Sequence, residues 1–361
     1  MKIIHTGDIH LGAALKNLPP EKARMRKAEL AETFRRLCLY ARENGVSVVL
    51  IAGDLFDSDN ISSQWRKEFF KVVAAAKPVC FFYISGNHDE WLEFEEAPPD
   101  NLYFFGEYHA WKSYDLPENV TVTGIDGKNM DSQAYLRLSL RSDRYNIVMM
   151  HGEISKGEGT GKESISLLRL QNKGIDYLAL GHIHQPTLGV ERIDGRGHFR
   201  YCGCLEGRGF DECGKRGFFL LDVREGRLIS ESFLSLAKRE ICEEVADISA
   251  CQTYFDVERT AMETLKEQSA ENQIKLILRG RHTAALKKDI PLLTQRLNER
   301  FFFVKVVDES RVYVDYSAFA SDVSERGEFV REVGRYEMNE DFRAEILEVG
   351  LKALAGEEID L

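Results

Sequence analysis

Five short apolar stretches, each followed at once by a polar motif, constrain the fold of this chain more than any other feature. They run over residues 3–4, 46–51, 80–84, 147–150 and 177–180. Short apolar runs of this kind are typical of buried strands. In an open α/β sheet, strands that end together present the residues after them at a common edge, where ligands bind. The pattern therefore predicts an α/β fold in which the polar motifs meet at one rim.

The motifs after these stretches are rich in Asp, His and Asn. They are Asp8-Ile9-His10, Gly53-Asp54, Gly86-Asn87-His88-Asp89, His151-Gly152 and Gly181-His182-Ile183-His184. Seven of their side chains are candidate metal ligands: Asp8, His10, Asp54, Asn87, His151, His182 and His184. Carboxylate, amide and imidazole donors without a thiolate suit manganese, iron or zinc. Each motif alone is a common loop sequence, but five in this order favour a metal centre.

Seven ligands are too many for one tetrahedral site, so we expect two sites that share a bridging ligand. Asp54 is the best candidate for the bridge, because a carboxylate binds two cations at once. Two ions about 3.5–4 Å apart form a clamp suited to in-line displacement at phosphorus. Such a pair would supply hydroxide and neutralise the phosphate oxygens.

His88 is expected to act on the substrate and not on the metals. It adjoins Asn87, and adjacent residues in a turn rarely both face one metal pair. We expect His88 to contact the scissile phosphate and to donate a proton to the leaving oxygen. Asp89 would hold its other ring nitrogen and raise its pKa.

The order of these motifs over residues 8–184 resembles the signature of the calcineurin-like metallophosphoesterases. Residues 5–12, 53–57 and 180–184 resemble the motifs of DNA-repair exonucleases of the SbcD type, and residues 201–223 resemble the YhaO-like branch. The expected fold is a metallophosphoesterase two-sheet β-sandwich flanked by helices, in αββα layers, with a small C-terminal α/β cap domain.

The resemblance also implies how the ligands divide. One metal would be held by Asp8, His10, Asp54 and His184, and the other by Asp54, Asn87, His151 and His182. It implies manganese as the usual ion, and the donor types leave iron or zinc as alternatives. The implied reaction is phosphodiester hydrolysis in DNA, and the implied partner is a coiled-coil ATPase of the SbcC type. Some relatives carry histidine where Asp57 stands, so Asp57 is given no role.

The sequence predicts three parts: a nuclease domain over 1–236, a cap over 250–320 and a helical tail over 324–361. Apolar residues at helical spacing predict helices over 21–44 and 62–76. In the cap we expect helices over 254–269 and 284–300, a strand over 274–278, and a hairpin of 301–307 with 311–316. The amphipathic tail could pack on its own domain or on a partner.

Composition bounds the location and the partners. No apolar run approaches the ~20 residues needed to cross a bilayer, and we expect no signal peptide. Seven scattered cysteines indicate reduced thiols in a cytoplasmic protein. A net charge of −11 argues against tight DNA binding by this chain alone, because such binding rests on cation–phosphate contacts.

We therefore expect a two-metal DNA exonuclease or endonuclease subunit that works with the ATPase and that is compatible with a homodimer. One alternative is a metallophosphoesterase acting on nucleotides or phosphoproteins. The other is a mainly structural subunit that assembles the ATPase complex.

Overall fold

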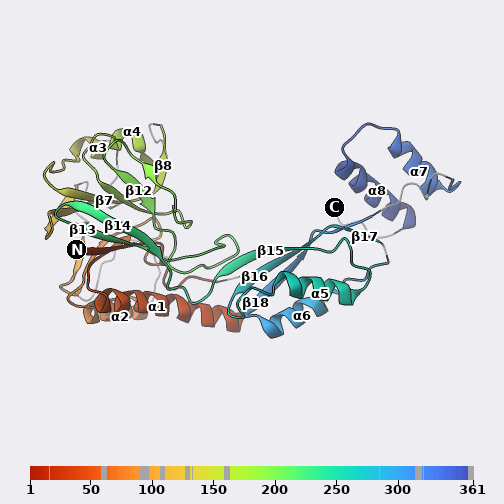
Figure 1. Ribbon diagram of the computed structural model, residues 1–361, viewed down its shortest axis with the longest axis horizontal. Coiled ribbons are helices and arrows are strands. Elements are labelled where there is room, and N and C mark those ends of the chain that lie inside the picture. The colour runs from red at the N-terminus through yellow and green to blue at the C-terminus, as the bar shows by residue number, and fades with distance from the viewer. Residues whose placement is uncertain are drawn as a thin grey trace. The chain divides into compact units, whose positions relative to one another are not determined.

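The computed structural model describes residues 1–15, 17–57, 63–89, 97–105, 110–126, 131, 133–157, 163–283, 285–313, 319 and 321–356 (Figure 1). The chain forms two compact units, Met1–Ile241 and Cys242–Leu361. The three-part division expected from the sequence stays a prediction.

The first unit contains two six-stranded sheets. The first sheet has the order β14-β13-β1-β2-β3-β4, with β1 (Lys2–Thr6), β2 (Val46–Ala52), β3 (Cys80–Ile84), β4 (Leu102–Phe104), β13 (Phe218–Arg224) and β14 (Arg227–Leu234). The second sheet has the order β11-β12-β10-β7-β6-β5, with β5 (Lys112–Leu116), β6 (Val120–Gly124), β7 (Tyr145–His151), β10 (Tyr177–Gly181), β11 (Glu191–Arg192) and β12 (His198–Tyr201). A separate parallel pair joins β8 (Glu153–Ser155) to β9 (Ser164–Ser166).

The central strands of each sheet run parallel, which puts their carboxyl ends at the same edge. In the first sheet, β1 pairs in parallel with β2 and β2 with β3. In the second sheet, β7 pairs in parallel with β6 and with β10. β2 is buried on both faces, as expected for a central parallel strand.

Alternate residues of the central strands enter different cores. Val48 and Leu50 face the second sheet and share a core with Ile147 of β7. Val49 and Ile51 face the opposite way, into a core with helices α1 (Pro20–Glu43) and α2 (Ser63–Ala75). This period of two is the signature of a strand covered on both faces.

The helices complete four layers. Phe34 and Leu37 of α1 and Phe69 of α2 lie on the outer face of the first sheet, which confirms the two helices expected there. Short helices α3 (Ala134–Arg137) and α4 (Leu167–Leu170) flank the outer face of the second sheet (Figure 1). The helix–sheet–sheet–helix fold expected from the sequence is confirmed.

The second unit has a three-stranded sheet of order β15-β16-β18. Its strands are β15 (Ile241–Asp247), whose first residue belongs to the first unit, β16 (Gln273–Arg279) and β18 (Phe303–Asp308). Helices α5 (Tyr254–Thr264) and α6 (Ile290–Arg300) share its core. In the tail, α7 (Glu325–Gly334) and α8 (Glu340–Ala355) pack together through Val330, Val333 and Leu347. Among the described residues, no helix has the length and apolar character needed to cross a membrane.

Two expectations for the second unit are wrong. No hairpin joins residues 301–307 to 311–316 in the described part of the chain. Instead β18 pairs in parallel with β16, and β17 (Arg281–His282) with β19 (Arg311–Val312). β16 and β18 are parallel because α6 connects the end of β16 to the start of β18, as helices do in other crossover connections.

The second correction concerns where helices begin and end. α6 begins at Ile290, not at residue 284, and α5 ends at Thr264, not at residue 269. Pro291 lies in the first turn of α6, where a missing N–H breaks no helical hydrogen bond. Asp289 caps this turn by accepting a hydrogen bond from the Leu292 N–H.

Candidate metal centre

The candidate ligands lie at the carboxyl ends of five strands that belong to both sheets. From the first sheet, Asp8 and His10 follow β1, Asp54 follows β2 and Asn87 follows β3; from the second, His151 ends β7, and His182 and His184 follow β10. The structure brings all seven side chains together. They lie between the edges of two sheets, and not at the single rim that the sequence predicts.

Backbone contacts fix the first three of these residues relative to one another. The parallel pairing of β1 with β2 continues past the strands, because Asp8 N–H donates to Gly53 O and His10 N–H donates to Asp54 O, both at 3.0 Å. The second sheet is attached to the first by His182 N–H, which donates to Asp8 Oδ1 at 2.9 Å. These bonds position the side chains before any ion is bound.

Four of the seven residues have left-handed backbone conformations. Asp8, His10 and Asp54 have φ of 46°, 48° and 46°, and His182 has φ of 94°. Residues other than glycine adopt this region at a cost of order 1–3 kcal/mol each, and such residues cluster at functional sites. The turn at Gly86 has no room for a side chain, since a Cβ there would lie 2.1 Å from Asp54 Oδ1.

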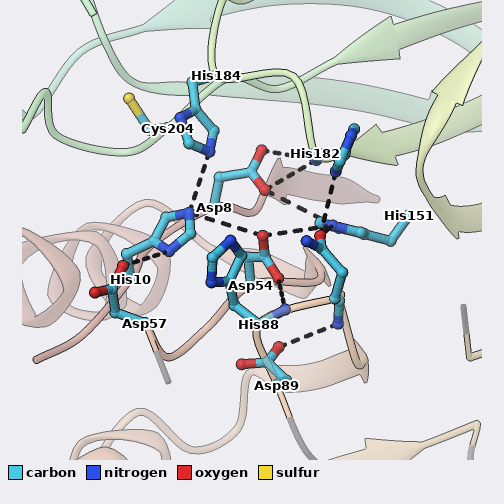
Figure 2. A network of polar contacts seen from close by, with 12 residues as sticks. Asp8, His10, Asp54, Asp57, His88, Asp89, His151, His182, His184 and Cys204 are labelled. Carbon is cyan, nitrogen blue, oxygen red and sulfur yellow. Dashed lines mark hydrogen bonds and ion pairs between the residues drawn. The ribbon is translucent and has the colours of Figure 1, made fainter. Parts of the chain in front are cut away.

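One group of ligand atoms comes from Asp8, His10, Asp54 and His184, all within 4.8 Å of one another. His10 Nε2 lies 3.1 Å from His184 Nε2 and 3.8 Å from Asp54 Oδ2 (Figure 2). Two imidazole nitrogens facing each other beside buried carboxylates form a donor set that a divalent cation would satisfy. This group has the composition that the family resemblance implies for one metal.

A second group forms on the other side of Asp54. His151 Nε2 lies 2.9 Å from Asn87 Oδ1 and 3.5 Å from Asp54 Oδ2. His182 Nδ1 lies 3.2 Å from the same Asn87 oxygen. Asp54 therefore contacts histidines of both groups, and this geometry fits two ions that share its carboxylate.

Burial and mutual charge set the protonation of the site. Burial raises the pKa of Asp8 to about 6 and lowers the pKa of His10 to about 4. Although burial opposes it, contact with His151 and His10 holds the pKa of Asp54 well below its usual range. Burial also opposes a charged His151, yet Asp54 and Asp8 raise the pKa of His151 to about 9. Asp8 and Asp54 are both buried, and a cation beside them would offset the cost of burying their negative charge.

His88 and Asp89 have different surroundings from those expected. His88 is exposed, its ring lies edge-on to the His10 ring at 5.2 Å between centroids, and its N–H donates to Asp54 Oδ1 at 2.9 Å. Asp89 is 1 % exposed, and its carboxylate accepts hydrogen bonds from the N–H groups of Leu55, Phe56 and Gly86.

The expected contact between Asp89 and the His88 ring is not found among the contacts of the described residues. Asp89 lies beneath the turn, where backbone donors occupy its oxygens, and it therefore holds the turn that carries Asn87 and His88. Burial raises the pKa of Asp89, with Asp54 adding to the effect.

Three residues that sequence reasoning left without a role contact the histidines from behind. Asp57 Oδ1 lies 3.2 Å from His10 Nδ1, and Glu212 Oε1 lies 2.7 Å from His184 Nδ1. Arg208 contacts both carboxylates. A ligating histidine needs an acceptor for its second nitrogen, but residues 57 and 212 are distant in sequence from the histidines they serve. Only the resemblance of residues 201–223 drew attention to the segment that holds Arg208 and Glu212.

Comparison with known proteins identifies related chains. A family model described as calcineurin-like phosphoesterase matches residues 1–186, which include all seven candidate ligands. Metallophosphoesterase YhaO of Bacillus subtilis is 25% identical over 302 residues, covering 78% of this chain and 72% of that protein. DNA double-strand break repair protein Mre11 of Methanopyrus kandleri is 28% identical over 274 residues, covering 65% and 57%. The SbcD subunit of the nuclease SbcCD of Escherichia coli is 24% identical over 284 residues, covering 65% and 68%.

Proposed function

Because this chain belongs to the calcineurin-like phosphoesterase family of metal-dependent hydrolases, we propose that it is a DNA nuclease subunit with two divalent ions. The observation that carries the proposal is the sharing of Asp54 between two groups of donors. Relatives named as a DNA repair protein and a nuclease subunit support DNA as the substrate class.

The donor set fits the ions that the proposal requires. Oxygen and imidazole donors suit manganese, with iron or zinc as alternatives. Asp8, His10, Asp54 and His184 would hold one ion, and Asp54, Asn87, His151 and His182 the other. When bound, such a pair lowers the pKa of a water and neutralises the oxygens of the phosphate.

The residues of the chain would prepare the substrate and handle the proton. Asp54 contacts His10 of one ligand group and His151 of the other, and so holds the two groups next to each other. His88 is exposed beside this centre, so its ring is free to meet the scissile phosphate and to donate a proton from a ring nitrogen to the leaving oxygen. Asp89 fixes the turn from which His88 projects.

DNA engagement is proposed to need a partner. The chain carries 59 acidic and 48 basic residues, and an acidic chain gains little from releasing the counterions of DNA. We propose an SbcC-like coiled-coil ATPase as that partner, with the α7–α8 tail as one docking element.

The test is manganese-dependent digestion of end-labelled duplex DNA, with and without the candidate ATPase. Wild-type protein should cleave, and Asp54→Ala should not. Asp143→Asn, which removes an exposed acid paired with Arg141, is the matched control and should cleave normally. Nucleotide diesters and phosphoproteins are assayed in parallel. Hydrolysis of these compounds without cleavage of DNA would replace the nuclease proposal.

A role in assembly alone is tested in the same complex. If the complex forms and supports its DNA reaction equally well with Asp54→Ala, the subunit serves as a scaffold and the proposal fails.

A further inference from the structure

Arg208 connects the histidines of one group of ligands from behind. We propose that Arg208 is a positioning residue that fixes His10 and His184 together, so that the ion they hold binds more tightly than its neighbour. This inference rests on the proposed two-metal function and extends it to an inequality between the two ions.

The guanidinium of Arg208 spans two carboxylates. Nη1 donates to Asp57 Oδ1 at 3.0 Å. Nη2 and Nε donate to Glu212 Oε1 at 2.8 Å and 3.1 Å. The Arg208 backbone N–H also donates to Glu212 Oε2 at 2.6 Å. Arginine suits this task because its planar group presents five donors in a fixed arrangement.

Each of those carboxylates faces one histidine. Asp57 Oδ1 is 3.2 Å from His10 Nδ1, and Glu212 Oε1 is 2.7 Å from His184 Nδ1. With both Nδ1 atoms turned to acceptors, both Nε2 atoms face the cation position, 3.1 Å apart. Arg208 Nη2 also lies 3.0 Å from His184 Nδ1, so Arg208 contacts this histidine directly as well as through Glu212.

The segment that carries Arg208 is itself held in place. Arg216 donates to His184 O and to Glu212 O, both at 3.1 Å. Gly207 O accepts a hydrogen bond from Arg26, which is fully buried. Glu212 is 2 % exposed. Arg208 and Glu212 are therefore positioned by the fold and do not depend on an ion for their placement.

In the other group of ligands, the histidines have weaker partners at the nitrogen atoms that face away from the metal site. His151 Nδ1 donates to a backbone carbonyl, Ala52 O, at 2.8 Å. His182 Nε2 faces Glu163 at 3.7 Å, and the Glu163 side chain is 49% exposed. No arginine joins these two histidines among the described residues. Outer partners of metal-bound histidines typically change metal affinity 10–100-fold, so the two ions should bind unequally.

The experiment titrates Mn²⁺ into the full-length protein after chelator treatment, by calorimetry, and records the Mn²⁺ paramagnetic resonance spectrum. Wild type should bind two ions, the first more tightly. In Arg208→Gln, one equivalent should keep its affinity and the other should weaken ~10–100-fold. At one added equivalent, the spectrum of the bound ion should then differ from that of wild type, because the ion occupies the ligand group that contains Asn87.

Two further variants define the mechanism. Arg208→Lys keeps the charge but reaches one carboxylate at a time, so it should give a smaller loss at the same equivalent. Lys215→Gln removes an exposed positive charge from the same segment and should bind both ions as wild type does. Circular dichroism checks each fold, and Asp57→Asn replaces Arg208→Gln if the latter does not fold.

The outcomes separate the two proposals. Two ions bound by Arg208→Gln or Asp57→Asn at wild-type affinities, or weakened equally, would overturn the positioning role and leave the two-metal function standing. Failure of wild type to bind two ions would instead overturn the proposed function and the inference with it.

Discussion

His151 Nδ1 donates a hydrogen bond to the carbonyl oxygen of Ala52 at 2.8 Å. The donor ends β7 of the second sheet and the acceptor ends β2 of the first. One bond thus joins the two sheets directly behind the candidate metal centre and leaves His151 Nε2 facing Asp54 and Asn87. The packing of the two sheets therefore also orients His151 toward the other ligands.

Replacing Asp54 should remove both metals. Asp54→Ala removes the carboxylate that the two groups of ligands share. Hydrolysis should fall below detection, and metal analysis after gel filtration should find no retained ions. The variant should also lose the stabilisation that excess Mn²⁺ gives to wild type, which is about 2.7 kcal/mol at 100 times the dissociation constant. Retention of both ions would contradict the bridging role.

Replacing His88 should separate catalysis from metal binding. His88→Ala removes an exposed ring that packs edge-on against the His10 ring, so two ions should still bind. The rate constant kcat should fall by about 10²–10⁴-fold, the usual contribution of a general acid. Calorimetry and steady-state kinetics on one preparation test this. Loss of an ion would reassign His88 as a ligand.

A methyl group at Gly86 should displace Asp54. The added Cβ of Gly86→Ala would lie 2.1 Å from Asp54 Oδ1 and 2.5 Å from Asp54 N. Both metal affinities should therefore fall, because the shared carboxylate moves. Gly189→Ala meets nothing within 4 Å and serves as the control. Equal Mn²⁺ titrations for the two variants would show that the turn yields without moving Asp54.

A buried histidine away from the metal ligands should make the fold sensitive to acid. His5 is fully buried with Nδ1 2.9 Å from Tyr177 Oη, and burial lowers the pKa of His5 to about 3. The pKa of this imidazole is near 6.5 in the unfolded chain. Between about pH 6.5 and 3, His5 is therefore protonated in the unfolded chain but neutral in the folded chain. The free energy of unfolding should therefore fall by up to about 1.4 kcal/mol per pH unit as pH decreases through that window.

The measurement is urea unfolding of wild type and His5→Gln at several pH values. The difference between the two proteins isolates the contribution of His5 from those of the other titrating groups. Wild type should lose stability more steeply below about pH 6.5. Parallel pH profiles would show that folding leaves the pKa of His5 unchanged and would contradict this prediction.

The sequence predicted most of the sandwich because its signals are local. Apolar stretches followed by Asp or His identify strands and their ends, and the spacing of Leu30, Phe34 and Leu37 identifies the buried stripe of α1. The same locality explains the errors. Whether β18 pairs with β16 or with a later strand depends on the crossover through α6, which no window of sequence reveals.

The contacts behind the ligands were beyond sequence reasoning for a different reason. Nothing in the neighbourhood of Glu212 or Asp57 marks them as acceptors for histidines 28 and 47 positions away. Asp89 was misjudged because its neighbour His88 suggested a side-chain contact, while the turn directs its carboxylate to backbone donors. Such relations depend on tertiary positions and become visible only in three dimensions.

The left-handed backbone at Asp8, His10 and Asp54 has an evolutionary consequence. Their backbone strain lowers the stability of the folded state. Selection for heat resistance alone should therefore favour glycine at these positions, which would relieve the strain but remove the metal ligands. A lineage kept under pressure for turnover should instead accumulate compensating changes elsewhere. Directed evolution under the two regimes would show the trade-off as diverging sequences at three positions.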